Sequence, residues 1–213
     1  MNADPKWRRR KTARPGEIEA AALEIFAERG FAAARLEEIA ERAGLSKAAL
    51  YVYYPNKTEL FRAVVGTRAA PDIDGIARIL ETADVPFAEL ARAMLARMAE
   101  TLGRPGVRSL ARMVIAEGRN FPEIARLWHD DVVARALTAM TTAIARAQAR
   151  GEVRPGTPRL MALSLIGPMM LGALWIEVMQ PAGGEPLDLA ALAAEHFDTV
   201  AAGLLTPPLE RAA

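Results

Sequence analysis

The sequence predicts an all-α protein of about nine helices, and three observations favour this class. Apolar residues recur three and four positions apart along most of the 213 residues. No segment shows the two-residue alternation of apolar and polar side chains that a half-buried strand would need. The 52% of hydrophobic and 25% of charged residues suit a globular core and argue against disorder.

Clusters of glycine and proline separate the expected helices. A first helix ends near Gly30, two short helices follow, and a longer connector helix begins at Asn56 and runs to Pro71 or somewhat past it. The remaining helices are expected at Phe87–Leu102, Val107–Glu117, Glu123–Arg150, Arg159–Met179 and Leu187–Leu205. We expect two domains, residues 1–62 and residues 63–213.

The first expected helix, Glu17–Arg29, has one apolar stripe. The stripe comprises Ile18, Ala21, Ala22, Ile25 and Phe26. This spacing indicates a helix that packs behind the two short helices that follow it.

Residues 36–57 have the helix-ending and helix-starting signals of a helix-turn-helix. Small and apolar residues recur at helical spacing in the first short helix, at Leu36, Ile39, Ala40 and Ala43. Gly44 can adopt the left-handed conformation that ends a helix, and Ser46 can accept a hydrogen bond from the first turn of the next. One helix therefore ends and another begins within three residues.

The second short helix is expected from about Lys47 to Tyr54, because Pro55 disfavours its continuation. Small residues at Ala48 and Ala49 would let such a helix lie deep in the major groove of DNA. Its lysine and tyrosines can reach phosphates or the methyl group of thymine. The pattern therefore favours DNA binding.

Residues Gly30 to Phe61 resemble the DNA-binding half of a tetracycline-repressor-like (TetR-family) regulator. The family pattern, I-A-x-x-A-G-V-S followed by L-Y-x-x-F-x-x-K, is matched by Ile39, Ala40, Ala43, Gly44, Leu45, Ser46, Leu50, Tyr51, Tyr54 and Lys57. Two departures are Ala34 and Arg35 in place of a pair of threonines, and Ala48 in place of a glycine. The resemblance covers about the first third of the chain and implies a helical ligand-binding and dimerisation domain after it.

The residues expected to bind DNA are Arg35, Ser46, Lys47, Ala48, Ala49, Tyr51, Tyr53 and Lys57. Tyr51 and Lys47 are expected at base edges, and Arg35, Tyr53 and Lys57 at phosphates. The alternative is that Tyr51, Tyr53 and Tyr54 are core aromatic residues with surface hydroxyl groups.

A basic arm precedes these helices. Residues 1–14 carry a net charge of +5, from Lys6, Arg8, Arg9, Arg10, Lys11 and Arg14 against Asp4, so the other 199 residues sum to −4. Such an arm could be only a solvated tail, or it could contact phosphates or enter a minor groove.

The composition excludes several kinds of covalent, catalytic and metal-binding chemistry. The chain has no cysteine and two histidines, which excludes disulfides, thiolate catalysis and an all-histidine metal cage. We therefore expect no metal and no cofactor. A basic start followed by Pro15 and a charged segment does not resemble a signal peptide, so we expect a cytoplasmic protein.

Leu160 to Ile176 has no charged residue for 17 positions. A membrane span is the alternative to exclude, but the segment is slightly short, contains Gly167, Pro168 and Gly172, and lacks flanking topology signals. We expect one face to be buried in its own domain and the other against a second subunit. The last helix has a matching stripe, Leu189, Leu192, Ala193, His196, Phe197, Val200 and Leu204. The family resemblance implies a four-helix dimer bundle, whose two helix-turn-helix units would bind a palindrome.

A ligand pocket is expected near Pro168, because a proline within a helix removes one hydrogen bond and bends the helix. Methionine and aromatic residues suit adaptable apolar cavities. The expected ligand-binding residues are Met113, Glu117, Phe121, Trp128, Met169 and Trp175, with Glu117, His129 and Glu177 as possible polar anchors. The alternative is that they are ordinary core and surface residues.

The sequence thus predicts a homodimeric, sequence-specific transcriptional regulator that is not an enzyme. Its partners would be double-stranded DNA with a palindromic operator and a small hydrophobic ligand that releases the repressor. A ligand-independent DNA-binding or protein-interaction module remains an alternative, as does a helical enzyme, although the sequence has no nucleophile with a base and no phosphate-binding glycine loop to support it.

Overall fold

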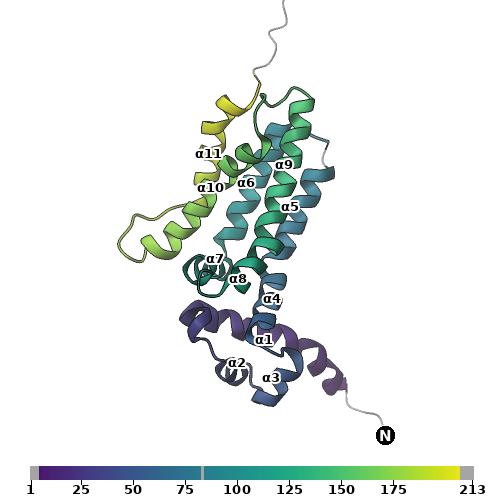
Figure 1. Ribbon diagram of the computed structural model, residues 1–213, viewed down its shortest axis with the longest axis vertical. Helices are drawn as coiled ribbons and strands as arrows, with labels where there is room; N and C mark the ends of the chain where they lie inside the picture. The colour runs from purple at the N-terminus through teal and green to yellow at the C-terminus, as the bar shows by residue number, and fades with distance from the viewer. Residues whose placement is uncertain (1–4, 83, 207–213) are drawn as a thin grey trace, which may run out of the picture. The chain divides into compact units, whose positions relative to one another are not determined.

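Figure 1 shows the computed structural model, which describes the backbone of residues 5–82 and 84–206 and the side chains of residues 15–80, 82 and 84–206. The elements in that part of the chain are helices, and the β-structure described there is an isolated bridge between Val153 and Leu205. The all-α prediction is confirmed.

The helices follow the predicted breaks closely. The N-terminal group is α1 (Pro5–Ala33), α2 (Leu36–Arg42), α3 (Lys47–Tyr53) and α4 (Lys57–Arg68). It is followed by α5 (Ala70–Thr82), α6 (Phe87–Gly103), α7 (Pro105–Glu117), α8 (Pro122–Trp128), the π-helical turn η1 (His129–Val133), α9 (Ala134–Ala149), α10 (Pro158–Leu174), the π-helical turn η2 (Trp175–Met179) and α11 (Leu189–Leu204).

The connector differs from the prediction. The sequence predicts one helix from Asn56 to Pro71 or beyond, whereas a turn at Ala69 separates α4 from α5. Pro71 lies in the first turn of α5, where its missing N–H needs no partner, while in an unbroken helix its ring would clash with the preceding turn.

Because α8, η1 and α9 run on as one helix, and α10 and η2 as another, the described residues hold ten continuous helices, one more than expected.

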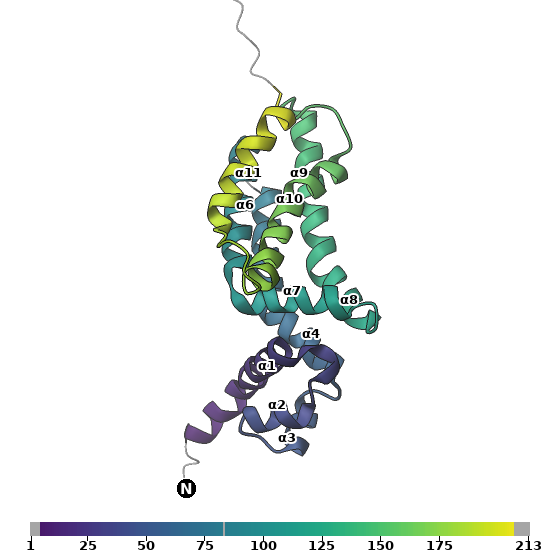
Figure 2. The same ribbon diagram turned by 90° about the vertical axis from the view of Figure 1, so that its left-hand side faces the viewer.

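The chain divides into two compact units, Met1–Arg68 with Ser109–Trp128, and Ala69–Arg108 with His129–Ala213. In the first unit α1 packs on α2 and α4, α2 lies beside α3, and α4 packs on α8 (Figure 2). The longer α1 therefore supports α2 directly, and α3 packs on α2.

Aromatic rings form the core of the first unit. Phe26, Phe31 and Phe61 contact one another with ring centroids 5.8 to 5.9 Å apart, and Phe121 packs on Phe31 at 5.2 Å. Rings at these separations contribute about 0.5–1.5 kcal/mol per pair beyond the area they bury. This cluster fixes α1 and α4 to the segment that contains α7 and α8.

The chain bends at Gly30, which has φ 76° and ψ 177° and interrupts the helical conformation of α1. The carboxylate of Glu117 accepts hydrogen bonds from the freed N–H groups just after the bend, at 2.9 Å from the nitrogen of Phe31 and 2.7 Å from that of Ala32. A Cβ atom on Gly30 would overlap this carboxylate. The bend therefore requires glycine for both its backbone conformation and its close approach to Glu117.

The second unit is a bundle in which α10 packs on α6, α9 and α11. A Cβ atom on Gly172 would lie 2.6 Å from a side-chain carbon of Leu192 and 2.9 Å from one of Leu189, so the glycine permits close approach of α10 and α11. Gly167 has nothing within 4 Å of its Cβ position and does not contribute to this contact.

The helix formed by α10 and η2 has one buried and one exposed apolar face. Pro158–Met179 is long and apolar enough to span a membrane, a property that core helices of soluble proteins share, and 33% of its apolar window is buried within the protein. Met161, Ala162, Leu165, Met169 and Ala173 face the bundle, and the exposed residues include Leu160, Leu163, Leu171, Trp175 and Val178. The predicted burial of one face in its own domain is confirmed.

We expect Gly30→Ala to lower the free energy of unfolding by about 2–4 kcal/mol, because it combines backbone strain with displacement of the Glu117 carboxylate. Gly44→Ala is the matched control: its φ is 66°, but nothing lies within 4 Å of its Cβ position, so about 1–2 kcal/mol is expected. Urea unfolding of both variants measures the difference. Equal decreases in the two variants would show that the Glu117 carboxylate contributes nothing to the bend.

Candidate DNA-binding surface and cavities

The turn between α2 and α3 is built as the sequence predicts. Gly44 has φ 66°, and its neighbour Leu45 donates its N–H to the carbonyl of Ala40 at 2.8 Å. The hydroxyl of Ser46 accepts a hydrogen bond from the N–H of Ala49 at 3.2 Å and so caps α3. Ser46 thus sets the start of α3.

One face of α3 is exposed to solvent, and Lys47 at the edge of this face forms an ion pair with α2. Leu50 is fully buried and anchors the helix, whereas Lys47, Ala48, Tyr51 and Val52 are exposed. Tyr51 is 41% exposed and Val52 82%. The predicted residues Lys47, Ala48 and Tyr51 are therefore brought together on one surface, and Val52, which the sequence prediction omits, lies among them.

Lys47 and Arg35 are both exposed but differ in their surroundings. The Lys47 ammonium pairs with the carboxylate of Glu37 on α2 and lies 5.8 Å from the centroid of the Tyr51 ring. The hydrogen bond in this pair lowers the pKa of Glu37 and raises the pKa of Lys47. Arg35 precedes α2 in an extended conformation, and its side chain makes no capping hydrogen bond. DNA phosphates would compete with Glu37 for Lys47.

Lys57 faces the bend in α1. Its ammonium donates to the carbonyl oxygens of Phe31, Ala32 and Ala34 at 2.5, 3.2 and 3.0 Å, and lies 4.6 Å from the centroid of the Phe31 ring. Burial lowers the pKa of Lys57, while the nearby Glu117 carboxylate opposes this effect. Since an ammonium has three N–H donors, these carbonyls occupy all of them. Lys57 therefore binds the backbone at the bend, and its direct phosphate contact stays a prediction.

The three tyrosines of α3 and its C-terminal end have different environments. Tyr54 donates its hydroxyl proton to the carboxylate of the buried Glu19 on α1 at 2.6 Å. Burial, and then this hydrogen bond, raise the pKa of Tyr54 above its ordinary value. Tyr53 and Tyr54 are both half-buried and Tyr51 is exposed, and the hydroxyl of Tyr54 is bonded to α1 and is not the surface hydroxyl of the alternative.

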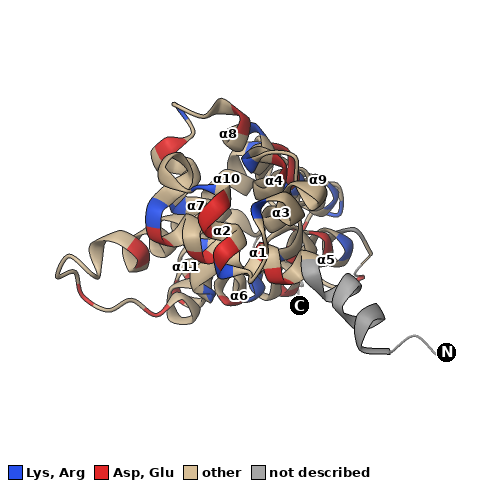
Figure 3. Ribbon diagram, turned by 90° about the horizontal axis from the view of Figure 1, so that it is seen from below, with Lys and Arg blue, Asp and Glu red and all other residues tan. Residues whose placement is uncertain are grey.

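The helices of this unit carry little net charge. Residues 15–68 contain seven Lys and Arg against eight Glu, and Figure 3 shows acidic residues concentrated on α2. The basic arm of residues 1–14 lies outside the described side chains. Its charge of +5 is the main excess of positive charge in the N-terminal part of the sequence.

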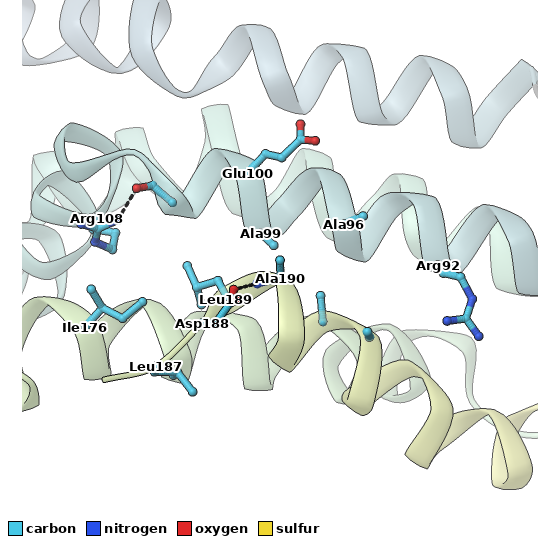
Figure 4. Close-up of a pocket in the computed structure, with 13 residues that line it drawn as sticks. Arg92, Ala96, Ala99, Glu100, Arg108, Ile176, Leu187, Asp188, Leu189 and Ala190 are labelled. Carbon is cyan, nitrogen blue, oxygen red and sulfur yellow. Dashed lines mark hydrogen bonds between the residues drawn. The ribbon is translucent and has the colours of Figure 1, made fainter. Parts of the chain in front are cut away.

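A cavity of about 500 Å³ lies in the second unit between α6, η2 and α11. Figure 4 shows Arg108 and Asp188 in its wall, where Arg108 donates to the carbonyl oxygen of Gly103 and Asp188 accepts from the N–H of Ala190 at 2.8 Å. The rest of the wall is mostly alanine and leucine. A second cavity, of about 450 Å³, lies between α10 and α11 near Met161 and Val200.

Neither cavity is lined by any of the six predicted ligand-binding residues. Four of them, Met113, Glu117, Phe121 and Trp128, belong to the first unit, and Met169 and Trp175 belong to the second. Met113 and Met169 are buried core residues, Glu117 binds backbone N–H groups, and the indole N–H of Trp175 donates to the carbonyl oxygen of Glu185 at 2.8 Å.

Two family descriptions match the chain, "Bacterial regulatory proteins, tetR family" over residues 18–64 and "Tetracyclin repressor-like, C-terminal domain" over residues 91–200. The second alone covers half of the sequence. The chain therefore belongs to the TetR family of bacterial regulatory proteins.

Individual relatives agree with this assignment. The transcriptional activator FasR of Mycolicibacterium smegmatis is 41% identical over 69 residues, which are 32% of each chain, so the match spans about a third of that relative. A structure from Mesorhizobium loti described as a TetR-family transcriptional regulator is 25% identical, with a TM-score of 0.72 over 92% of this chain and 99% of that one. The SmeT–triclosan complex, at 24% identity and a TM-score of 0.72 over 92% of this chain and 93% of SmeT, has the same fold.

Lys57→Met is expected to lower the free energy of unfolding by about 1–3 kcal/mol, because three carbonyl groups lose a charged donor. Arg62→Met is the control: its side chain is 56% exposed, and a change within about 0.5 kcal/mol is expected. Urea unfolding measures both. Unchanged stability of Lys57→Met, combined with weaker DNA binding, would instead support a direct contact of Lys57 with phosphate.

Proposed function

We propose that the protein is a homodimeric, sequence-specific DNA-binding transcriptional regulator, a repressor released from a palindromic operator by a small hydrophobic ligand. The observation that carries the proposal is the exposed face of α3, where Lys47, Ala48 and Tyr51 are accessible while Leu50 anchors the helix from behind. A helix held in this way can enter the major groove without rearrangement of its own domain.

The proposed contacts follow from the exposure of each side chain. Tyr51 and Lys47 read base edges, Arg35 and Tyr53 hold phosphates, and Ala48 and Ala49 allow close approach. Ser46 and Lys57 position α2 and α3. Residues 1–62 form the DNA-binding part in this proposal, and residues 63–213 the part that binds ligand and dimerises.

The exposed apolar face of α10 and η2 supports a dimer. Leu160, Leu171 and Trp175 are 62%, 67% and 38% exposed, and they recur at helical spacing on one side of the helix. Apolar surface of this kind is buried when two copies pair, and two-fold symmetry then matches the two halves of a palindrome.

Ligand control requires that the ligand bind the DNA-incompetent arrangement more tightly than the competent one. The cavity between α6, η2 and α11 is within the range of small-molecule sites, about 300–1,000 Å³, and its wall is mostly apolar. SmeT, of the same fold, is known as a complex with triclosan, which supports a small organic ligand here as well.

We further propose that the protein is cytoplasmic and has no enzymatic activity.

Selection from random-sequence DNA by the purified protein tests this function. We expect a palindromic site bound in the presence of excess unrelated DNA, with one or more dimers per site and release by at least one member of a panel of small apolar molecules. Binding without sequence preference would contradict the proposal.

Leu171→Glu is expected to convert the dimer to a monomer and to lower operator affinity by at least about tenfold, because each monomer then binds one half-site without its partner. Light scattering gives the molar mass and fluorescence anisotropy gives the affinity. Ile115→Glu, which places the same charge at a 60% exposed position on α7, serves as the control and should remain dimeric. A dimeric Leu171→Glu would place the dimer interface elsewhere.

Removal of residues 1–14 should make operator affinity less dependent on salt, because fewer phosphates are neutralised. If two or three cations of the arm bind phosphates in each subunit, the slope of log affinity against log salt falls by roughly 0.9 for each phosphate that is no longer neutralised. Titrations at several salt concentrations measure the slope. An unchanged slope would identify the arm as a solvated tail.

A further inference from the structure

Val52 is the most exposed of the large apolar residues in the described chain, at 82%. It lies in the middle of α3, between Tyr51 and Tyr53, and nothing in its own unit covers it. A branched aliphatic side chain has neither a hydrogen-bond donor nor a charge, so it cannot hold a phosphate or recognise a polar base edge.

The position of Val52 on α3 follows from helix geometry. Each residue advances about 100° around the axis, so Ala48 and Val52 both lie about 160° from the buried Leu50. These two residues form the crest of the exposed face, and Tyr51 and Lys47 lie to one side of it. Because Ala48 is only a methyl group, the branched end of Val52 stands unobstructed on the crest.

The side chain is also rigid. A β-branched residue in a helix keeps one χ1 rotamer in about 90% of cases, so the two methyl groups of Val52 occupy fixed positions. Holding them against a partner therefore costs little side-chain entropy. A fixed apolar group on the crest of α3 suits an apolar target at the bottom of a groove.

The major groove offers one such target, the 5-methyl group of thymine, which no other base carries. We propose that Val52 is a specificity-determining residue that selects thymine at one position of each half-site, through contact of its methyl groups with the thymine 5-methyl. This inference rests on the proposed function and adds to it a base preference and the residue that produces it.

The test pairs a protein variant with a base analogue. Within the operator selected by the wild-type protein, each thymine is replaced in turn by deoxyuridine, which lacks the 5-methyl group and keeps its base pairing. For wild type we expect about a fourfold decrease in affinity at one position per half-site, the effect of one methyl group removed from an apolar environment. For Val52→Ala that decrease should disappear, while the effects of deoxyuridine elsewhere stay the same.

Ile79→Ala, at a 52% exposed position on α5, is the control variant and should retain the full pattern of wild-type deoxyuridine effects. Repeated selection with Val52→Ala should yield sites in which the same thymine is no longer preferred. If Val52→Ala binds the operator as wild type does and shows the same deoxyuridine effects, Val52 does not select thymine, although the proposed function would stand. The crest of α3 would then be assigned to another partner, such as a protein. Absence of specific binding by wild type would overturn the proposed function and this inference together.

Discussion

The bend of α1 at Gly30 is the constraint on which the DNA-binding unit depends. A bend exposes N–H groups on one side and carbonyl groups on the other, and both need partners. Glu117 accepts from the N–H groups of Phe31 and Ala32, and Lys57 donates to the carbonyl groups of Phe31, Ala32 and Ala34. Two side chains of opposite charge, from α7 and from the start of α4, thus satisfy the same short segment of backbone.

The hydrogen bonds around this bend also determine the position of α3. Lys57 begins α4 directly after the loop that ends α3, and Tyr54 in that loop binds Glu19 on α1. Both interactions tie the C-terminal end of α3 to α1, while Ser46 sets its N-terminal end. A seven-residue helix is too short to be stable alone, so these fixed ends and the buried Leu50 determine its orientation.

Much of the fold can be predicted from signals between neighbouring residues, but contacts between residues far apart in the sequence cannot. Gly44, Ser46 and Leu50 act on neighbours within a few residues, so their roles can be inferred from spacing. The partners of Lys57 lie 23 to 26 residues away, and those of Glu117 85 and 86 residues away. No helical period relates such positions. Residue type alone assigns Lys57 to phosphate and Glu117 to a ligand, and spacing does not reveal that both side chains bind the backbone at the bend of α1.

The near balance of charge on residues 15–68 affects how the protein would search a genome. Non-specific affinity for DNA comes almost entirely from phosphate neutralisation, and millions of competing sites sequester a strongly cationic protein. With seven basic and eight acidic residues, and Lys47 paired with Glu37, the helices of residues 15–68 add little non-specific attraction of their own. In the sequence, the +5 charge of residues 1–14 is the larger source of such attraction, so the arm, more than the helix-turn-helix, would set how much of the protein is held on arbitrary DNA.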